Sequence, residues 1–396
     1  MKRASLLAAA AFLASSMIMP GFGPAHAAEP LKIGFISTLS GPGAALGKDL
    51  LDGFNLGIEQ SGGTLGGRKV ELVTGDDQLK PDVGRQLAER MIQRDKVDLI
   101  AGVVFSNVMM AVAKPIFDSK TFMLSLNAGP SALAGNRCSP YFFNVAWQND
   151  QSHEAMGKHV SDKGYKRVYL MAPNYPAGKD ALTGFKRYYT GGEVIGEIYT
   201  QINQPDYAAE LAQLRAAKPD AVYIFYPGGM GVNFIKQYAQ AGLKAEVPLF
   251  GPSFSFDQTI LPAVGEAALG VFNTGFWSPD MPNAQNQKFV KAFEAKYSRP
   301  PSPFAAQAYD GALLLASALT KTGGSVKDEA KFRSAMRAAD FESVRGPFAF
   351  NTNHYPIQNF YLREVIKNDQ GRITNRLVGT VFARHMDAYH DQCKMK

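Results

Sequence analysis

The sequence predicts an α/β protein with two similar lobes, each built on a parallel β-sheet. Short apolar runs alternate with longer amphipathic runs, which is typical of βα units in a parallel sheet covered on both faces. The alternation stops near residue 126 and begins again near residue 167. The chain has 396 residues, of which 46% are hydrophobic. This length suggests two domains, and this composition is sufficient for two cores.

The first βα series ends near residue 126. Its short apolar runs predict strands and its amphipathic runs predict helices, because side chains alternate faces in a strand and repeat every 3.6 residues in a helix. The predicted strands are 31–37, 70–76, 99–104 and 122–126, and the predicted helices are 46–60, 81–94 and 106–120.

The second series has the same form, and a helix-rich stretch follows it. Its predicted strands are 167–172, 195–199 and 221–226, with helices at 179–189, 208–217 and 232–241. Beyond them we predict helices at 287–297 and 305–320 and an extended segment at 346–363. The segment 140–150 links the two series, so we expect the first crossing between the lobes there.

The N-terminus has the three parts of a secretory signal. Lys2 and Arg3 are basic, residues 6–19 are uncharged and apolar, and the small-x-small pattern at 25–27 suits a signal peptidase. The apolar run is too short to cross a bilayer, which needs about 20 residues. We therefore expect a signal peptide at 1–27, a mature chain from about Ala28, and export to the periplasm.

Net charge and cysteine content limit the possible partners and the cellular compartment of the protein. The formal net charge is +7, and its Lys and Arg residues are scattered, so a nucleic-acid partner is not expected. The chain has two cysteines, Cys138 and Cys393. In an oxidising compartment such a pair most simply forms a disulfide, which would tie the C-terminus to a mid-chain loop. Two unrelated thiols are the alternative.

Catalytic motifs are missing from the sequence. It contains no phosphate-binding G-x-x-x-x-G-K-[ST] loop, no G-x-S-x-G nucleophile elbow and no H-E-x-x-H pair. Gly41, Gly43 and Gly47 come close to a dinucleotide fingerprint, but the last spacing is one residue too long. His385 and His390 could belong to a metal site, although a solvated tail is the simpler interpretation. We expect no enzymatic activity, no cofactor and no metal.

Small residues and helix starts follow several predicted strands. The carboxyl ends of strands are the ligand-binding edge of open α/β sheets, and helix N-termini there favour anions. The turns concerned are 40–43, 105–107, 127–129, 226–229 and 251–253. They predict a ligand-binding cleft between the two lobes.

Three segments carry a resemblance to a known family. The segment 33–42, with Gly47 and Gly53 in the next helix, resembles the type I periplasmic binding proteins. Within these proteins it resembles the leucine/isoleucine/valine-binding branch that serves ABC importers. The segments 62–77 and 306–312 are similar to the second strand with its acidic turn and to a characteristic helix of the family. The resemblance covers essentially all of the mature chain.

The resemblance implies two Rossmann-like lobes that are joined by three crossings and close around a small ligand. By this analogy lobe 1 is 28–147 plus 276–350, and lobe 2 is 148–275 plus 351–396. The family also implies a monomer.

Site residues are carried over where the motifs match. The resemblance implies that Ser106, after the third strand, hydrogen-bonds a ligand carboxylate. It implies backbone and hydroxyl contacts from Asn127, Ala128 and Gly129, although amino-acid binders commonly have Thr where this chain has Gly129. Tyr175 corresponds to an aromatic residue of lobe 2 that closes over the ligand.

One departure from the family pattern concerns the ligand. Amino-acid-binding relatives have an acid soon after the Gly-Pro of lobe 2, but here Ser253 and Phe254 follow Gly251-Pro252. A buried ammonium without a partner would cost several kcal/mol. Asp257 could substitute, but we expect it in the following helix. A zwitterionic amino acid is therefore disfavoured.

Aromatic residues lie at or beside the predicted cleft turns. They are Phe105, Tyr175, Tyr226, Phe254 and Phe304. Aromatic walls suit a flat ring, since ring pairs add about 0.5–1.5 kcal/mol beyond area burial. The expected ligand is an aromatic or phenylpropanoid carboxylate such as benzoate or coumarate. An aliphatic amino acid is one alternative, an amide or another solute is a second, and these rings could instead be core residues.

The expected function is solute capture by lobe closure, followed by delivery to an ABC permease in the inner membrane. A periplasmic sensor with the same ligand and a receptor partner is the alternative.

Overall fold

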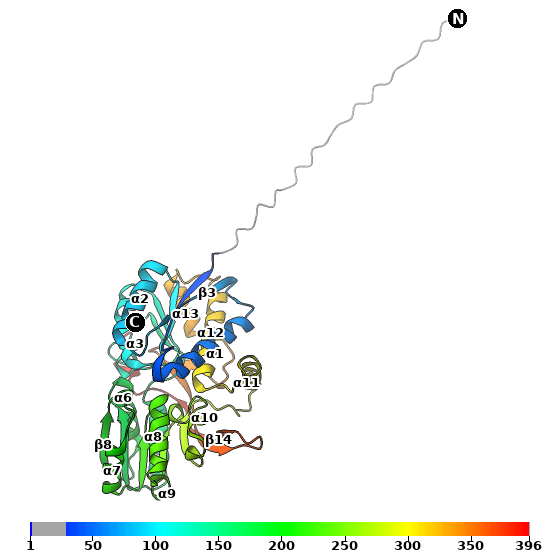
Figure 1. Ribbon diagram of the computed structural model, residues 1–396. Helices are drawn as coiled ribbons and strands as arrows, with labels where there is room; N and C mark the ends of the chain where they lie inside the picture. Colours follow the sequence, from blue (N-terminus) through cyan, green and yellow to red (C-terminus); the bar gives the residue numbers. More distant parts are fainter. Residues whose placement is uncertain (2–28, 396) are drawn as a thin grey trace.

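The computed structural model describes Met1 and residues 29–395, which form two lobes joined end to end (Figure 1). The predicted signal peptide, apart from Met1, lies outside the described residues. None of the helices in the described part of the chain is both long and apolar enough to span a bilayer. We call the lobe that contains the first strand lobe 1 and the other lobe 2.

Lobe 1 is built on a six-stranded sheet in the order β2-β3-β1-β4-β5-β6. β1 (Leu31–Ser37) pairs in parallel with β3 (Arg68–Asp76) and β4 (Leu99–Gly102), as the βα alternation predicts. The other strands are β2 (Thr64–Leu65), β5 (Phe122–Ser125) and β6 (Phe142–Asn144). The helices are α1 (Ala44–Gln60), α2 (Pro81–Arg90), α3 (Ser106–Asp118), α4 (Ser131–Ala134), α11 (Ala284–Tyr297), α12 (Pro303–Lys321) and α13 (Glu329–Arg337).

Lobe 2 repeats this architecture with an eight-stranded sheet in the order β12-β13-β11-β10-β9-β7-β8, and β14 pairs with β13. The strands are β7 (Arg167–Pro173), β8 (Glu193–Thr200), β9 (Ala221–Ile224), β10 (Leu249–Pro252), β11 (Phe272–Gly275), β12 (Ala349–Phe350), β13 (Pro356–Lys367) and β14 (Ile373–His385). The helices are α5 (Gln151–Asp162), α6 (Pro176–Tyr188), α7 (Ala208–Ala217), α8 (Gly229–Gln240), α9 (Leu243–Glu246) and α10 (Leu261–Val264).

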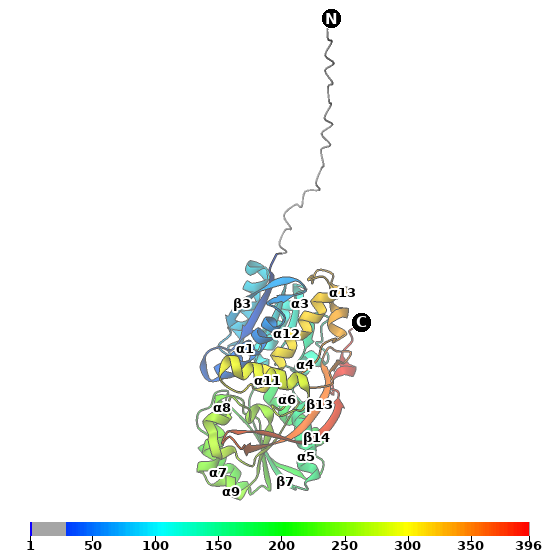
Figure 2. The ribbon, with the colours of Figure 1, turned by 90° about the vertical axis from the view of Figure 1, so that its right-hand side faces the viewer.

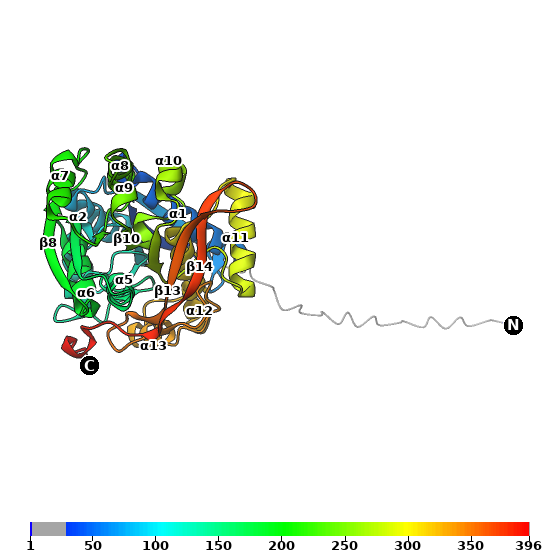
Figure 3. The ribbon, with the colours of Figure 1, turned by 90° about the horizontal axis from the view of Figure 1, so that it is seen from below.

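The edge of the second sheet differs from the parallel pattern. β13 pairs antiparallel with both β11 and β14, and β13 and β14 form a long hairpin along one side of lobe 2 (Figures 2 and 3). The sequence did not predict β14. Its one buried residue is Asn375, so its sequence lacks the apolar run of a central strand. The segment predicted as extended is also interrupted, because residues 351–355 form a turn.

Close helix packing explains part of the family motif in α1. This helix packs against α12, and a Cβ atom at Gly53 would lie 2.1 Å from the carbonyl oxygen of Ala305. Only glycine permits this approach, because any side chain would overlap the neighbouring backbone. Gly53 therefore fixes the position of α12, whose N-terminal residue Phe304 reaches the cleft.

The chain crosses between the lobes three times: after β6, after β11 and before β12. The buried Arg345 guanidinium joins two of these crossings. It donates hydrogen bonds to the carbonyl oxygens of Val145 (2.7 Å) and Ala146 (2.9 Å) and to Gln358 Oε1 (2.9 Å). It also pairs with Asp310 of α12 at 2.8 Å. This network makes the hinge region part of the core.

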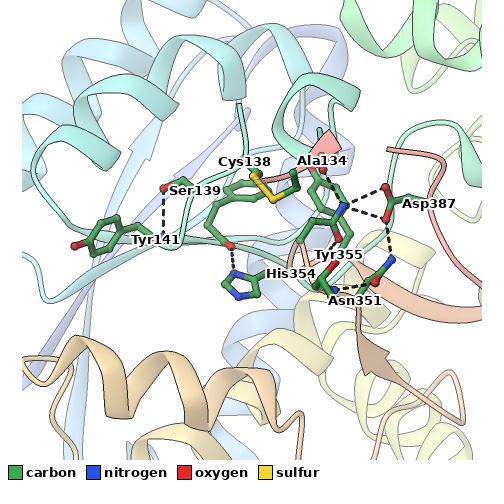
Figure 4. Close-up of a disulfide and its surroundings, with 12 residues drawn as sticks. Ala134, Cys138, Ser139, Tyr141, Asn351, His354, Tyr355 and Asp387 are labelled. Carbon is green, nitrogen blue, oxygen red and sulfur yellow. Dashed lines mark hydrogen bonds between the residues drawn. A yellow bond between two sulfur atoms is a disulfide. The ribbon is translucent and has the colours of Figure 1, made fainter. Parts of the chain in front are cut away.

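Cys138 and Cys393 form the predicted disulfide, with Cα atoms 5.7 Å apart (Figure 4). It holds the C-terminal tail beside the loop that follows α4. The tail is also held by Asp387, which accepts a hydrogen bond from Asn353 Nδ2 at 3.1 Å. Tyr389 donates its hydroxyl to Asp150 Oδ2 at 2.8 Å. The tail thus contacts both lobes.

Candidate ligand-binding site

A cavity of about 300 Å³ lies between the lobes, at the carboxyl ends of the strands. Both lobes and the first crossing contribute to its wall. The lining residues are Leu46, Val104, Phe105, Ser106, Asn127, Trp147, Asn149, Tyr175, Ala177, Phe225, Pro227, Phe254 and Phe304. This is the edge at which open α/β sheets bind ligands.

Three helices begin at or beside the cavity. Ser106 is the first residue of α3, Tyr175 and Ala177 flank the start of α6, and Pro227 precedes α8. None of these three N-termini has a side-chain cap. Free N–H groups and the helix dipole make such ends favourable for an anion.

The polar side chains of the cavity are held in fixed orientations. Asn127 donates from Nδ2 to the Val104 carbonyl oxygen (2.6 Å), and its Oδ1 accepts from Gln307 Nε2 (2.8 Å). Ser106 Oγ accepts a hydrogen bond from Asn149 Nδ2 at 3.1 Å. Gln307 belongs to the 306–312 motif, so this motif orients a polar group of the site.

Aromatic rings form most of the remaining wall. Trp147 packs against Phe254 with ring centroids 4.5 Å apart, and Phe254 packs against Phe304 at 5.3 Å. Tyr175 lies 6.3 Å from both Phe105 and Phe225. Such spacings are those of interacting ring pairs and leave apolar faces for a flat ligand.

The described lining of the cavity offers no negative charge to an ammonium group. None of the described residues that line it is acidic or basic. A carboxylate can be stabilised there by hydroxyl and backbone N–H donors, whereas a buried ammonium would lack a counter-charge at a cost of several kcal/mol.

Asp257 does not replace the missing acid. It lies in a turn before α10, not in the helix expected from the sequence, because its Oδ1 accepts from the backbone N–H (2.7 Å) and hydroxyl (2.6 Å) of Thr259. It is fully buried and does not line the cavity. Burial raises the pKa of its carboxyl to about 7.

Replacing Asp257 by asparagine is expected to stabilise the protein at neutral pH. The folded pKa of about 7 lies above the ordinary 3.8, so the contribution of this carboxyl to stability is greatest below about pH 4 and falls as the pH rises through 7. The gain of Asp257→Asn in urea denaturation should therefore grow from pH 4 to 7 and then level off. Asp369→Asn, at an exposed turn, is the control. An equal gain in stability at all pH values would contradict a raised pKa for Asp257 in the folded protein.

Six of the ten residues selected from the sequence line the cavity. They are Phe105, Ser106, Asn127, Tyr175, Phe254 and Phe304. Ala128 and Gly129 lie behind the wall. Their backbone N–H groups donate to the Val103 carbonyl oxygen (3.2 Å) and to Asn149 Oδ1 (3.0 Å), so they are not free to bind a ligand.

Tyr226 and Ser253 also do not line the cavity. The Tyr226 ring packs in the core of lobe 2 between Tyr207 (5.1 Å) and Phe234 (5.0 Å), and Pro227 faces the cavity instead. Ser253 is buried against Gly275, where its hydroxyl has no partner among the described residues. The direction of these side chains depends on packing that a turn motif does not encode.

Gly129 is required by close backbone approach. A Cβ atom there would lie 2.1 Å from the carbonyl oxygen of Trp147, so the threonine of amino-acid binders does not fit this backbone. Gly129→Ala is expected to cost about 1–3 kcal/mol of unfolding free energy, the usual cost of overpacking. Urea denaturation measures it. Gly379→Ala, which meets nothing within 4 Å, should change stability little. Equal effects of the two substitutions would rule out the close approach as the cause.

Two cavity residues of chemical importance, Trp147 and Asn149, are not among those selected from the sequence. Both lie in the first crossing, at the end of the 140–150 segment predicted to link the lobes. The predicted position of this crossing could have pointed to both residues, because a segment that links two lobes borders the cleft between them. The Trp147 Nε1–H group is buried and has no acceptor among the described residues.

Two α/β lobes with an aromatic-walled cavity between them define a protein of the class that binds small ligands. A family model described as periplasmic binding protein matches residues 30–371, and the chain belongs to this family as a solute-binding protein of an ABC transporter. The Leu/Ile/Val-binding protein homolog 6 of Brucella melitensis biotype 1 is 31% identical over 389 residues, or 96% of this chain and 97% of that protein. Other members of the family are periplasmic.

Solved structures agree with this assignment. A solute-binding protein of an ABC transporter from R. palustris, in complex with benzoate, is 35% identical with a TM-score of 0.88. The match covers 92% of this chain and all of that one. A solute-binding protein from Rhodopseudomonas palustris BisB5, in complex with 3,4-dihydroxybenzoic acid, is 34% identical with a TM-score of 0.84, covering 91% and 99% of the two chains.

Proposed function

We propose that this protein captures a small aromatic carboxylate in the cavity between its lobes and delivers it to an ABC permease of the inner membrane. The observation that carries the proposal is the combination of aromatic walls, three uncapped helix N-termini and a lining without charged side chains. An apolar ring with one negative charge satisfies all three features.

The carboxylate is bound on the side of lobe 1, at the N-terminus of α3. Ser106 Oγ–H donates to it, and the free N–H groups at the start of the helix add to the positive potential. The ring then lies among Trp147, Tyr175 and Phe254, which come from the first crossing and from lobe 2. Closure of lobe 2 therefore completes the site and excludes water.

The narrowness of the cavity favours a ligand with one ring and a short acid. The space between its lining atoms is at most about 300 Å³, open solvent included. A benzoate suits it better than the longer coumarate. The relatives from R. palustris and its BisB5 strain, which are in complex with benzoate and with 3,4-dihydroxybenzoic acid, support the same class of ligand.

The proposal includes the setting in which the protein acts. It is exported, its signal peptide is cleaved near Ala27, and it works as a periplasmic monomer that does not transform its ligand. We keep the lobe bounds expected from the sequence except at the last crossing, because β12 (Ala349–Phe350) pairs with β13 of lobe 2. Lobe 1 then comprises 28–147 plus 276–348, and lobe 2 comprises 148–275 plus 349–396.

Calorimetric titration of protein stripped of ligand by unfolding and refolding tests the proposal. Benzoate, 4-coumarate, the neutral isostere benzamide and leucine are titrated in parallel. We expect tight binding of benzoate, weaker binding of 4-coumarate, and no binding of benzamide or leucine. Ser106→Ala should weaken benzoate binding about 10- to 100-fold, the effect of losing a hydrogen bond to a charged group.

Ser253→Ala is the matched control, because this buried serine does not line the cavity. It should leave the benzoate affinity within about twofold of the original. Tight leucine binding without benzoate binding would overturn the proposed ligand class. Equal affinities for benzoate and benzamide would overturn the assignment of an anion site at α3.

A further inference from the structure

A chain of hydrogen bonds connects the cavity to the contact between the lobes. Asp180, on α6 of lobe 2, accepts hydrogen bonds from the backbone N–H (3.0 Å) and hydroxyl (2.7 Å) of Ser131, at the start of α4 in lobe 1. The same carboxylate accepts from Asn149 Nδ2 at 2.9 Å. Asp180 is 9% exposed and Asn149 is 1% exposed, so these bonds are shielded from water.

Asn149 uses both of its side-chain N–H groups and its carbonyl oxygen. One N–H goes to Asp180 Oδ2 and the other to Ser106 Oγ at 3.1 Å, while Oδ1 accepts the backbone N–H of Gly129 at 3.0 Å. The Asn149 backbone N–H also donates to the Gly129 carbonyl oxygen at 2.9 Å. The amide is therefore fixed between Ser106 and Gly129 of lobe 1 and Asp180 of lobe 2.

The bond from Asn149 decides the direction of the Ser106 hydroxyl. A hydroxyl group has one hydrogen to donate. Here its oxygen already accepts a hydrogen bond from the Asn149 NH₂ group, which can only donate. Within the described residues, Ser106 Oγ takes part in no other hydrogen bond. Its hydrogen is then available to an acceptor in the cavity, which this residue lines.

We propose that Asn149 is a positioning residue that fixes Ser106 as a hydrogen-bond donor to the ligand. In this proposal Asp180 holds the Asn149 side chain in place only when the lobes are closed. This inference rests on the proposed function in one respect, the contact of Ser106 with a ligand acceptor. Opening the lobes separates Asp180 from Ser131 and removes one of the anchors of Asn149. Ligand binding at Ser106 and closure at Asp180 thereby favour each other.

A double-mutant cycle between Ser106 and Asn149 tests the positioning role. The dissociation constant of benzoate is measured for the original protein, Ser106→Ala, Asn149→Ala and the double variant. Each single substitution should weaken binding about tenfold or more. The double variant should be within about threefold of the weaker single variant, because the two residues act as one unit. Should Asn149→Ala fail to fold, Asp180→Asn takes its place in the cycle.

Dissociation kinetics test the closure role. Asp180→Ala should raise the benzoate dissociation rate about fivefold or more while changing the association rate less than about twofold. Stopped-flow fluorescence can follow this, since Trp147 lines the cavity. Gln148→Ala is the matched control, because this buried amide of the same crossing bonds to Asp150 and does not line the cavity. It should leave both rates unchanged.

Two outcomes would overturn the inference. Additive losses in the cycle would show that Asn149 affects binding independently of Ser106. A loss of affinity in Gln148→Ala equal to that in Asn149→Ala would show general damage to the crossing. Failure of the proposed function is distinguishable. If leucine binds and benzoate does not, the cycle is measured with leucine, whose carboxylate is also an acceptor for Ser106.

Discussion

Asp310→Ala is expected to lower the free energy of unfolding by about 3–5 kcal/mol, the cost of leaving a buried charge without its partner. Asp310 accepts hydrogen bonds from Ser343 Oγ (2.6 Å), the Val344 N–H (3.0 Å) and Arg345 Nε (2.8 Å). Both members of the ion pair are buried, with side chains 1% or less exposed. Urea denaturation with a fitted midpoint and slope measures the loss.

The double variant Asp310→Ala/Arg345→Met separates the buried charge from general damage. Removing both charges should be less destabilising than Asp310→Ala alone, because no unpaired charge remains. Asp118→Ala, which breaks an exposed pair with Lys114, should cost less than about 1 kcal/mol. If the double variant is the least stable of all, the hinge network contributes through its hydrogen bonds and not through its charge.

Loss of the disulfide is the second large effect. Cys138→Ser is expected to cost about 2–4 kcal/mol, the typical effect of removing a disulfide. The bond restricts the unfolded chain by closing a loop of 255 residues. Thermal or urea denaturation measures it. The double variant Cys138→Ser/Cys393→Ser should match the single variant, and a reductant should destabilise the original protein by the same amount.

The C-terminal tail has other contacts, which limit how much structure is lost when the disulfide is removed. Tyr389 donates to Asp150, and Asp387 accepts from Asn353, independently of the sulfur atoms. The fold and the cavity should therefore survive without the disulfide, and benzoate binding should be retained in the double cysteine variant. A cost below about 0.5 kcal/mol would mean that these contacts, and not the covalent bond, restrain the tail.

The hinge and the ligand site use the same segment of chain. Val145 and Ala146 accept from Arg345, Trp147 forms a wall of the cavity, and Asn149 bonds to Ser106. A change in the angle between the lobes must therefore alter the site directly. This arrangement would couple the proposed closure of the lobes to binding.

The order of strands and helices was predictable because it depends on local periodicity. β1 and α7 have the bounds expected from the sequence, and the start of α3 at Ser106 was expected as well. β14 was not predictable, since an edge strand with one buried residue has little apolar signal. Its position depends on pairing with β13, which is a tertiary contact.

By itself, the sequence determined the two α/β lobes, the edge of the sheets at which the cavity lies, and the absence of an acid after Gly251-Pro252. Tertiary structure alone decided that Tyr226 faces the core, that Gly129 leaves no room for a side chain, and that Asn149 lies beside Ser106. The reason is physical. Periodicity specifies which face of an element is buried, whereas the direction of a side chain in a turn is set by contacts with residues far away in the chain.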